Sequence, residues 1–132
     1  MPSRESETVF QSYGRCCNNP QFFIDFYHRF MNSSPAIKAR FADVDMKQQR
    51  HLLRNGIMQL VLHARGMPDT KLRDLAKSHS RSGYNIDPAW YDPWLDALLA
   101  TLRQHDPEFN DDVEQAWRSA IMPGIEIIRG GY

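Results

Sequence analysis

The chain has 132 residues, 16 basic and 16 acidic side chains, and a formal net charge of +0. This length suits one domain with a sizeable core, and the neutral balance excludes the electrostatic footprint expected for binding to nucleic acid or an anionic membrane. The apolar runs are too short for a membrane-spanning helix, and the beginning, MPSRESETVF, lacks a signal-peptide pattern. We therefore expect a single cytoplasmic domain over residues 1–132, without nucleic-acid or membrane partners.

Turn signals divide the first half of the chain into helix-length segments. Residues 5–17 predict a first, weakly patterned helix. Asn19 is expected to cap a second helix with Pro20 at its first position, where a missing N–H costs nothing. The sequence SSP predicts a short helix over 35–40, and a long helix is expected over 45–64.

The next two helices are also marked by capping residues. Asp69 or Thr70 is expected to cap a short amphipathic helix that ends at His79. Asp87 and Pro88 are expected to begin the helix that follows, because a proline is favoured in the first turn.

Asp106 and Pro107 are predicted to begin the last helix in the same way. Pro123, followed by Gly124, is expected to kink or end it, because an internal proline removes a helix hydrogen bond and clashes with the preceding turn. No segment shows the alternating pattern of a strand, so the prediction is an all-α domain of about seven helices.

The two cysteines, Cys16 and Cys17, are adjacent. Neighbouring cysteines form a disulfide only with strained geometry, so we expect free thiols, as in a reducing cytoplasm. A role as small buried hydrophobic residues is favoured over a redox role.

Three polar side chains fall on the apolar faces of three different predicted helices. Tyr27 shares its face with Phe30. Gln49 lies in the same stripe as Leu53, and His79 ends the short amphipathic helix. Each could be a core group whose polar atoms are satisfied, since a buried amide needs partners. Because a neutral imidazole is a good iron ligand, an apolar pocket around a metal-bearing cofactor is an equally good explanation for the three together.

Over nearly its whole length the sequence resembles a globin. FYHRFMNSSPAIKARF (26–41) is similar to the family's second and third helices and ends in Phe41, which matches the phenylalanine that packs on haem. LAKSH (75–79) is similar to the segment that carries the proximal histidine, and WYDPWLDALLATL and EQAWRSAI look like the last two helices. Tyr27 resembles the distal tyrosine of bacterial globins and flavohaemoglobins.

The resemblance implies a globin-like helical sandwich, of the three-over-three type, that encloses a haem b pocket. It implies His79 as the iron ligand, and Tyr27 and Gln49 as distal residues that donate hydrogen bonds to O₂, NO or CO. Other contacts with haem are expected from Phe41, Leu53, Leu75, Arg81, Tyr84 and Tyr91.

The distal residue depends on the register of the long helix. A register two residues longer would replace Gln49 by His51 and would bury Asn55. At 100° per residue, however, His51 lies about 160° from the centre of the apolar stripe. We therefore predict that Gln49 faces the pocket and that His51 lies at the surface.

Flavohaemoglobins support the proximal histidine with a tyrosine and a glutamate. Tyr91 can stand for the tyrosine, whereas Glu126 is a poor match for the glutamate. No glycine-rich turn of a flavin or nicotinamide site occurs, so oxidation of nitric oxide is expected only with a separate reductase. Gas sensing through a partner, a haem-free globin fold and a homodimer remain open at this point.

Overall fold

The structure, a computed structural model, describes residues 3–132 and contains only helices and connecting loops in that range. The elements are α1 (Arg4–Cys16), α2 (Pro20–Asn32), α3 (Pro35–Arg40), α4 (Met46–Ala64), α5 (Thr70–His79), the 3-10 helix η1 (Pro88–Trp90), α6 (Tyr91–His105) and α7 (Asp111–Gly130). The predicted all-α class and the predicted succession of helices are confirmed. None of the helices in residues 3–132 has the length and apolarity that crossing a membrane requires.

Side-chain caps fix where the early helices begin. The side chain of Asn19 accepts a hydrogen bond of 3.0 Å from the backbone N–H of Gln21, and a proline occupies the first turn of α2. Ser34 caps α3 in the same way through the N–H of Ala36, at 3.2 Å. Asp45 caps α4. These bonds satisfy N–H groups that have no partner inside the helix, and they confirm the predicted beginnings of α2, α3 and α4.

The last helix differs from its prediction at its beginning. Helix α7 begins at Asp111, with Asn110 as its cap, and not at Asp106. The carboxylate of Asp106 accepts a local hydrogen bond of 2.9 Å from the backbone N–H of Glu108, and it is also held by tertiary contacts, because Ser12 Oγ donates to it at 2.7 Å and Arg15 Nε at 2.6 Å. These contacts join α1 to the corner between α6 and α7.

Helix α7 also continues through Pro123 to Gly130, so of the two expected effects of Pro123, a kink or an end, the end does not occur. An internal proline costs roughly 3 kcal/mol. The turns beyond it bury Ile125 and Ile128, and full burial of an isoleucine contributes about 1.5–3 kcal/mol. The two buried side chains therefore outweigh the cost of the proline.

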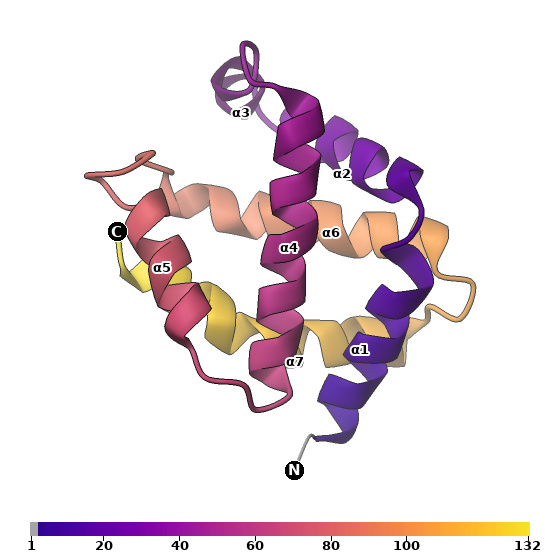
Figure 1. Ribbon diagram of the computed structural model, residues 1–132. Helices are drawn as coiled ribbons and strands as arrows, with labels where there is room; N and C mark the ends of the chain where they lie inside the picture. Colours follow the sequence, from indigo (N-terminus) through magenta and orange to yellow (C-terminus); the bar gives the residue numbers. More distant parts are fainter. Residues whose placement is uncertain (1–2) are drawn as a thin grey trace.

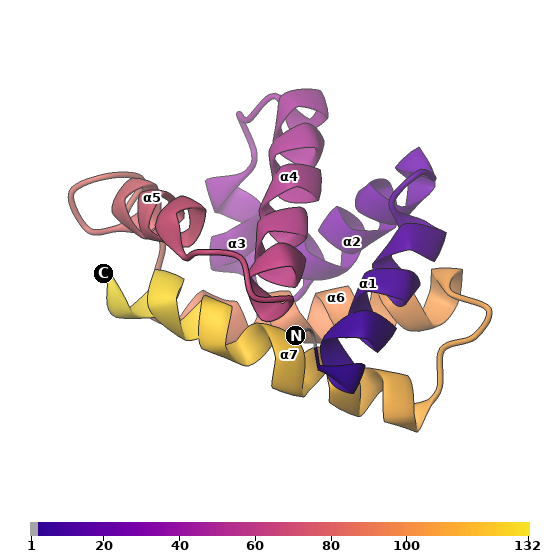
Figure 2. The same ribbon diagram turned by 60° about the horizontal axis from the view of Figure 1, so that its bottom comes forward.

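The helices cross in two layers. Helices α1, α4 and α5 lie over α6 and α7, with α4 between α1 and α5 (Figure 1). The second view shows α6 and α7 along one side of the molecule and α4 standing away from them (Figure 2). Helix α7 packs against α1, α4 and α5, and α2 packs against α6. One face of α4 is turned toward the space between α2, α5 and α6.

The crossing of α4 and α5 over α7 depends on a small residue. Gly124 is buried in α7, and a Cβ atom placed there would lie 2.7 Å from Leu60 Cδ2 and 3.1 Å from Leu72 Cδ1. Leu60 belongs to α4 and Leu72 to α5, so both helices rest on α7 at this glycine.

Candidate functional site

A cavity of about 640 Å³ lies among α2, α3, α4, α5 and α6, and its wall is mainly apolar. Eight of the predicted site residues line it: Tyr27, Phe41, Gln49, Leu53, Leu75, His79, Tyr84 and Tyr91. Residues far apart in the sequence are therefore brought to one internal space, which the apolar faces of several helices enclose.

Tyr27 and Gln49 are in direct contact. Gln49 Nε2 donates a hydrogen bond of 3.1 Å to Tyr27 Oη, which links α4 to α2. The hydroxyl group of a tyrosine can accept and donate at once. Because Tyr27 Oη accepts from Gln49 and donates to no other described residue, its hydrogen remains available to a molecule in the cavity.

The Tyr27 hydroxyl is protected from ionisation by its surroundings. The residue is buried, with 4% of its surface exposed. Burial raises the pKa of Tyr27 to about 12, although the hydrogen bond from Gln49 and the charge of Arg50 act in the opposite direction. The hydroxyl consequently stays a hydrogen-bond donor throughout the neutral range.

His79, the expected iron ligand, is the last residue of α5. Its Nδ1 lies 2.8 Å from the carbonyl oxygen of Leu75 and 3.1 Å from Ser78 Oγ. Because a carbonyl oxygen only accepts, Nδ1 carries the proton, and in the neutral ring Nε2 keeps its lone pair. Burial lowers the pKa of His79, and the hydrogen bond to Leu75 partly opposes this shift. The lowered pKa favours the neutral ring. His79 thus carries its proton on Nδ1, which the backbone holds, and leaves Nε2 free, as in histidines that ligate metals.

Aromatic contacts shape the cavity on the side of α2 and α3. The Phe41 ring lies just beyond the end of α3, with its centroid 5.6 Å from that of Tyr27 and 6.0 Å from that of Phe30, in edge-to-face contact. Such contacts hold flat rings in a defined orientation. Leu53 on α4 and Leu75 on α5 add aliphatic surface to the same wall.

The tyrosines at the other end of the cavity differ in exposure. Tyr84 is 66% exposed and lies at the edge of the cavity. Tyr91 lies deeper, and its burial raises its pKa to about 12. Glu126, considered as a partner for Tyr91, is exposed and forms an ion pair with Arg129.

Arg81 is the predicted site residue that does not line the cavity. Its guanidinium lies over the ring of Tyr132, 4.9 Å from the centroid, and its backbone N–H donates to the Tyr132 carbonyl at 3.2 Å. The sequence analysis missed Arg40, which does line the cavity. Arg40 ends α3 just before Phe41, so its neighbour in the sequence could have indicated its position.

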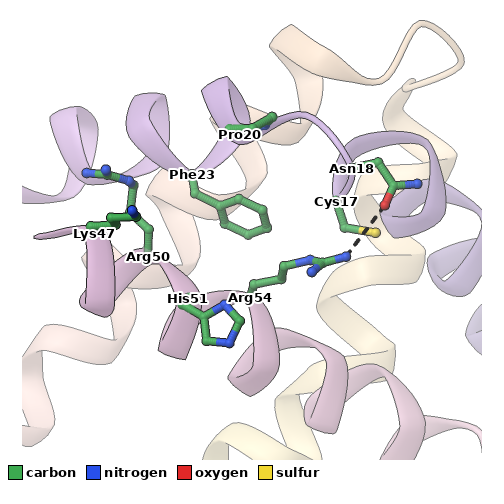
Figure 3. A pocket seen from close by; sticks show the side chains of 8 residues that line it. All are labelled: Cys17, Asn18, Pro20, Phe23, Lys47, Arg50, His51 and Arg54. Carbon is green, nitrogen blue, oxygen red and sulfur yellow. Dashed lines mark hydrogen bonds between the residues drawn. The ribbon is translucent and has the colours of Figure 1, made fainter.

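The structure also separates the two alternatives for the distal residue. His51 is exposed and lines a different, shallow cleft, together with Arg50 and Arg54 (Figure 3). Gln49 and Leu53 line the large cavity. The helical phase of α4 therefore places Gln49, and not His51, beside Tyr27.

Comparison with known families shows the family of this chain. The family model described as Globin matches residues 24–123 of this chain. The chain belongs to the globin family.

A solved structure agrees with this assignment. It is the crystal structure of a protein from Pseudomonas aeruginosa PAO1, described as structurally highly homologous to a human hemoglobin. The two chains are 50% identical, the match covers 98% of each, and the TM-score is 0.94. No curated protein matches the chain.

Proposed function

We propose that this globin binds haem b in the large cavity and binds a diatomic gas there. The observation that carries the proposal is the placement of His79 and Tyr27 on one cavity. His79 offers Nε2 because Leu75 holds Nδ1, and Tyr27 offers a hydroxyl hydrogen because its oxygen accepts from Gln49. Haem supplies an iron atom with a coordination position for O₂, NO or CO.

The residues of the cavity fit this cofactor. Cavities that hold ligands of this kind measure about 300–1,000 Å³ and are mainly apolar, with a few placed polar groups. The volume of about 640 Å³ and the apolar wall agree with both conditions. In the proposal His79 ligates the iron, while Phe41, Leu53 and Leu75 pack against the macrocycle.

The polar side chains have separate roles in the proposal. Tyr27 and Gln49 donate hydrogen bonds to the bound gas, which favours a ligand that carries partial negative charge. Arg40 and Tyr84 lie where the cavity meets solvent, and they hold the haem carboxylates. Tyr91 packs beside the proximal side of the cofactor.

The test removes the imidazole and then returns it. The His79→Gly protein is reconstituted with haem, and its ferrous absorption spectrum and its rate of haem loss are measured with and without free imidazole. We expect an altered spectrum and faster haem loss, both reversed by imidazole.

The control is His51→Gly, which removes an exposed imidazole from another helix. It should leave the spectrum unchanged. If the His79→Gly protein keeps the spectrum and haem affinity of the wild type, the assignment of His79 is wrong. If the wild-type protein fails to bind added haem, the proposed function itself is wrong.

A further inference from the structure

A second cleft has a volume of about 270 Å³ (Figure 3). The residues that α4 contributes to it are different from those that α4 contributes to the large cavity. One wall is made by the turn between α1 and α2 and the beginning of α2, including Asn18 and Phe23. The other wall is α4, which contributes Lys47, Arg50, His51 and Arg54. No residue of this wall belongs to the proposed gas site.

The α4 wall is basic and carries no acidic side chain. Positions 47, 50, 51 and 54 follow the spacing i, i+3, i+4, i+7, so they lie on one face of the helix. Like charges at this spacing oppose each other. In a chain with a formal net charge of +0, such a concentration of positive charge is a local feature.

The cations of this cleft are also free of ion pairs. Among the described residues, neither Lys47, Arg50 nor Arg54 has a carboxylate within 4.0 Å, whereas Arg15 and Arg65 are paired. The nearest polar contact is between Arg54 Nη2 and Asn18 Oδ1, at 3.5 Å.

The acidic residue that directly precedes α4 has another role. Asp45 is the cap of α4, where its carboxylate accepts from two backbone N–H groups, and it lines the large cavity rather than the cleft. The positive charge of the cleft is therefore not neutralised by the residues that form it.

We propose that this cleft is a binding site for a small, multiply charged anion of the phosphate class, such as a diphosphate. Arg54 extends toward Asn18 at one end, whereas Lys47 and Arg50 lie at the other end, with the Phe23 ring between them (Figure 3). Two groups of cations separated in this way suit an anion with charge at both ends. Guanidinium groups bind phosphate oxygens in pairs, with charge-assisted hydrogen bonds.

The size of the cleft limits the ligand. Its volume of about 270 Å³ falls below the range of about 300–1,000 Å³ that is usual for drug-sized ligands. A diphosphate or a short phosphate ester fits this limit, whereas a dinucleotide exceeds it.

The test uses inorganic diphosphate and the haem-loaded full chain. Calorimetric titration at constant ionic strength gives the affinity of the wild type and of the double variant R50Q/R54Q. We expect the double variant to bind more weakly, by roughly tenfold for each guanidinium removed. The charge-matched control is K71Q/K77Q, which removes two exposed cations from α5 and should keep the wild-type affinity.

Cys17 supplies a local measurement in the same cleft. Its thiol is half-buried, whereas Cys16 is fully buried, and burial raises the pKa of Cys16 to about 12. Bound diphosphate should slow the alkylation of Cys17 by iodoacetamide, which is uncharged. The proposal is overturned if the wild type shows no binding, if both double variants lose affinity equally, or if diphosphate leaves the alkylation rate unchanged. None of these outcomes affects the proposal for the large cavity.

Discussion

The hydrogen bond between Gln49 and Tyr27 determines which polar atoms face the large cavity. Gln49 Nε2 donates to Tyr27 Oη, so one hydrogen of the amide and the tyrosine hydroxyl hydrogen are left for a third partner. Under the proposed function, two donors in an apolar cavity would favour some gases over others, because a hydrogen bond stabilises a polarised ligand more than an apolar one.

We expect Tyr27→Phe and Gln49→Leu each to speed the release of oxygen, with a smaller effect on carbon monoxide. A hydrogen bond to a charged group contributes about 1.5–3 kcal/mol, which corresponds to roughly a ten- to hundredfold change in rate. Dissociation of each gas can be followed by stopped-flow absorbance.

His51→Leu is the matched control for this prediction, since His51 lies outside the large cavity. Its oxygen dissociation rate should equal that of the wild type. An increase in His51→Leu, with no change in Gln49→Leu, would contradict the distal assignment.

The position of the site residues was predictable where helical phase decides it. Tyr27, Gln49 and His79 reach one cavity because each lies on the apolar face of its helix. Arg81 lies in a loop, where no period applies, and its stacking on Tyr132 is a tertiary contact. The contact of Arg40 with the cavity could be inferred only from its neighbour Phe41, because the short sequence of α3 does not determine how the helix is placed.

At the scale of the helices, the sequence predicted the beginning of a helix correctly where neighbouring residues make the cap. Asn19 and Ser34 cap through backbone N–H groups two residues away. Asp106 also accepts from a backbone N–H group two residues away, that of Glu108, yet no helix begins there. Its carboxylate is bound in addition by Ser12 and Arg15, which are distant in the sequence, so tertiary contacts decide its position. Helix α7 passes Pro123 for a comparable reason, since the packing of its later turns depends on other helices.

The ion pair of Asp106 should be important for stability. The Asp106 side chain has 0% exposure and that of Arg15 has 26%. We expect Asp106→Asn to lower the free energy of unfolding by about 3 kcal/mol, at the lower end of the range for breaking a buried pair. Urea denaturation of the two proteins measures the difference. Glu7→Gln, which breaks an exposed pair with Arg65, should cost about 1 kcal/mol or less.

The pH dependence provides an independent check on Asp106. Burial alone would raise its pKa, but the hydrogen bonds from Arg15 and Ser12 outweigh burial and lower it. A lowered folded-state pKa contributes stability above the unfolded value of about 3.9. The difference between wild type and Asp106→Asn should therefore be full above this pH and shrink as the pH falls through the lowered pKa. A constant difference would contradict this assignment.

At the scale of the whole molecule, α4 contributes residues to the walls of two separate cavities. Gln49 and Leu53 line the large cavity, whereas Arg50 and Arg54 line the basic cleft. Helix α7 supports α4 at Gly124, next to Leu60, which also lines the large cavity. A change at this support should affect stability and the haem cavity together.

We expect Gly124→Ala to lower the melting temperature and to speed haem loss. The alanine gains about 1 kcal/mol of helix propensity, but its methyl group would lie 2.7 Å from Leu60 Cδ2, and overpacking a core costs about 1–3 kcal/mol. Gly14→Ala is the control, because nothing lies within 4 Å of the added Cβ, and it should raise the melting temperature. Equal stabilisation by both substitutions would contradict this prediction, because it would show that Leu60 and Leu72 move aside without loss of stability.

The shared support at Gly124 also constrains how the sequence can change over generations. A larger residue at this position presses on Leu60 and Leu72 at once, and these belong to the helices that carry Gln49 and His79. We expect a lineage to accept such a residue more readily once position 60 or 72 has become smaller. Among related globins, we therefore expect residue volumes at these three positions to vary inversely, while the two sides of the haem cavity keep their spacing.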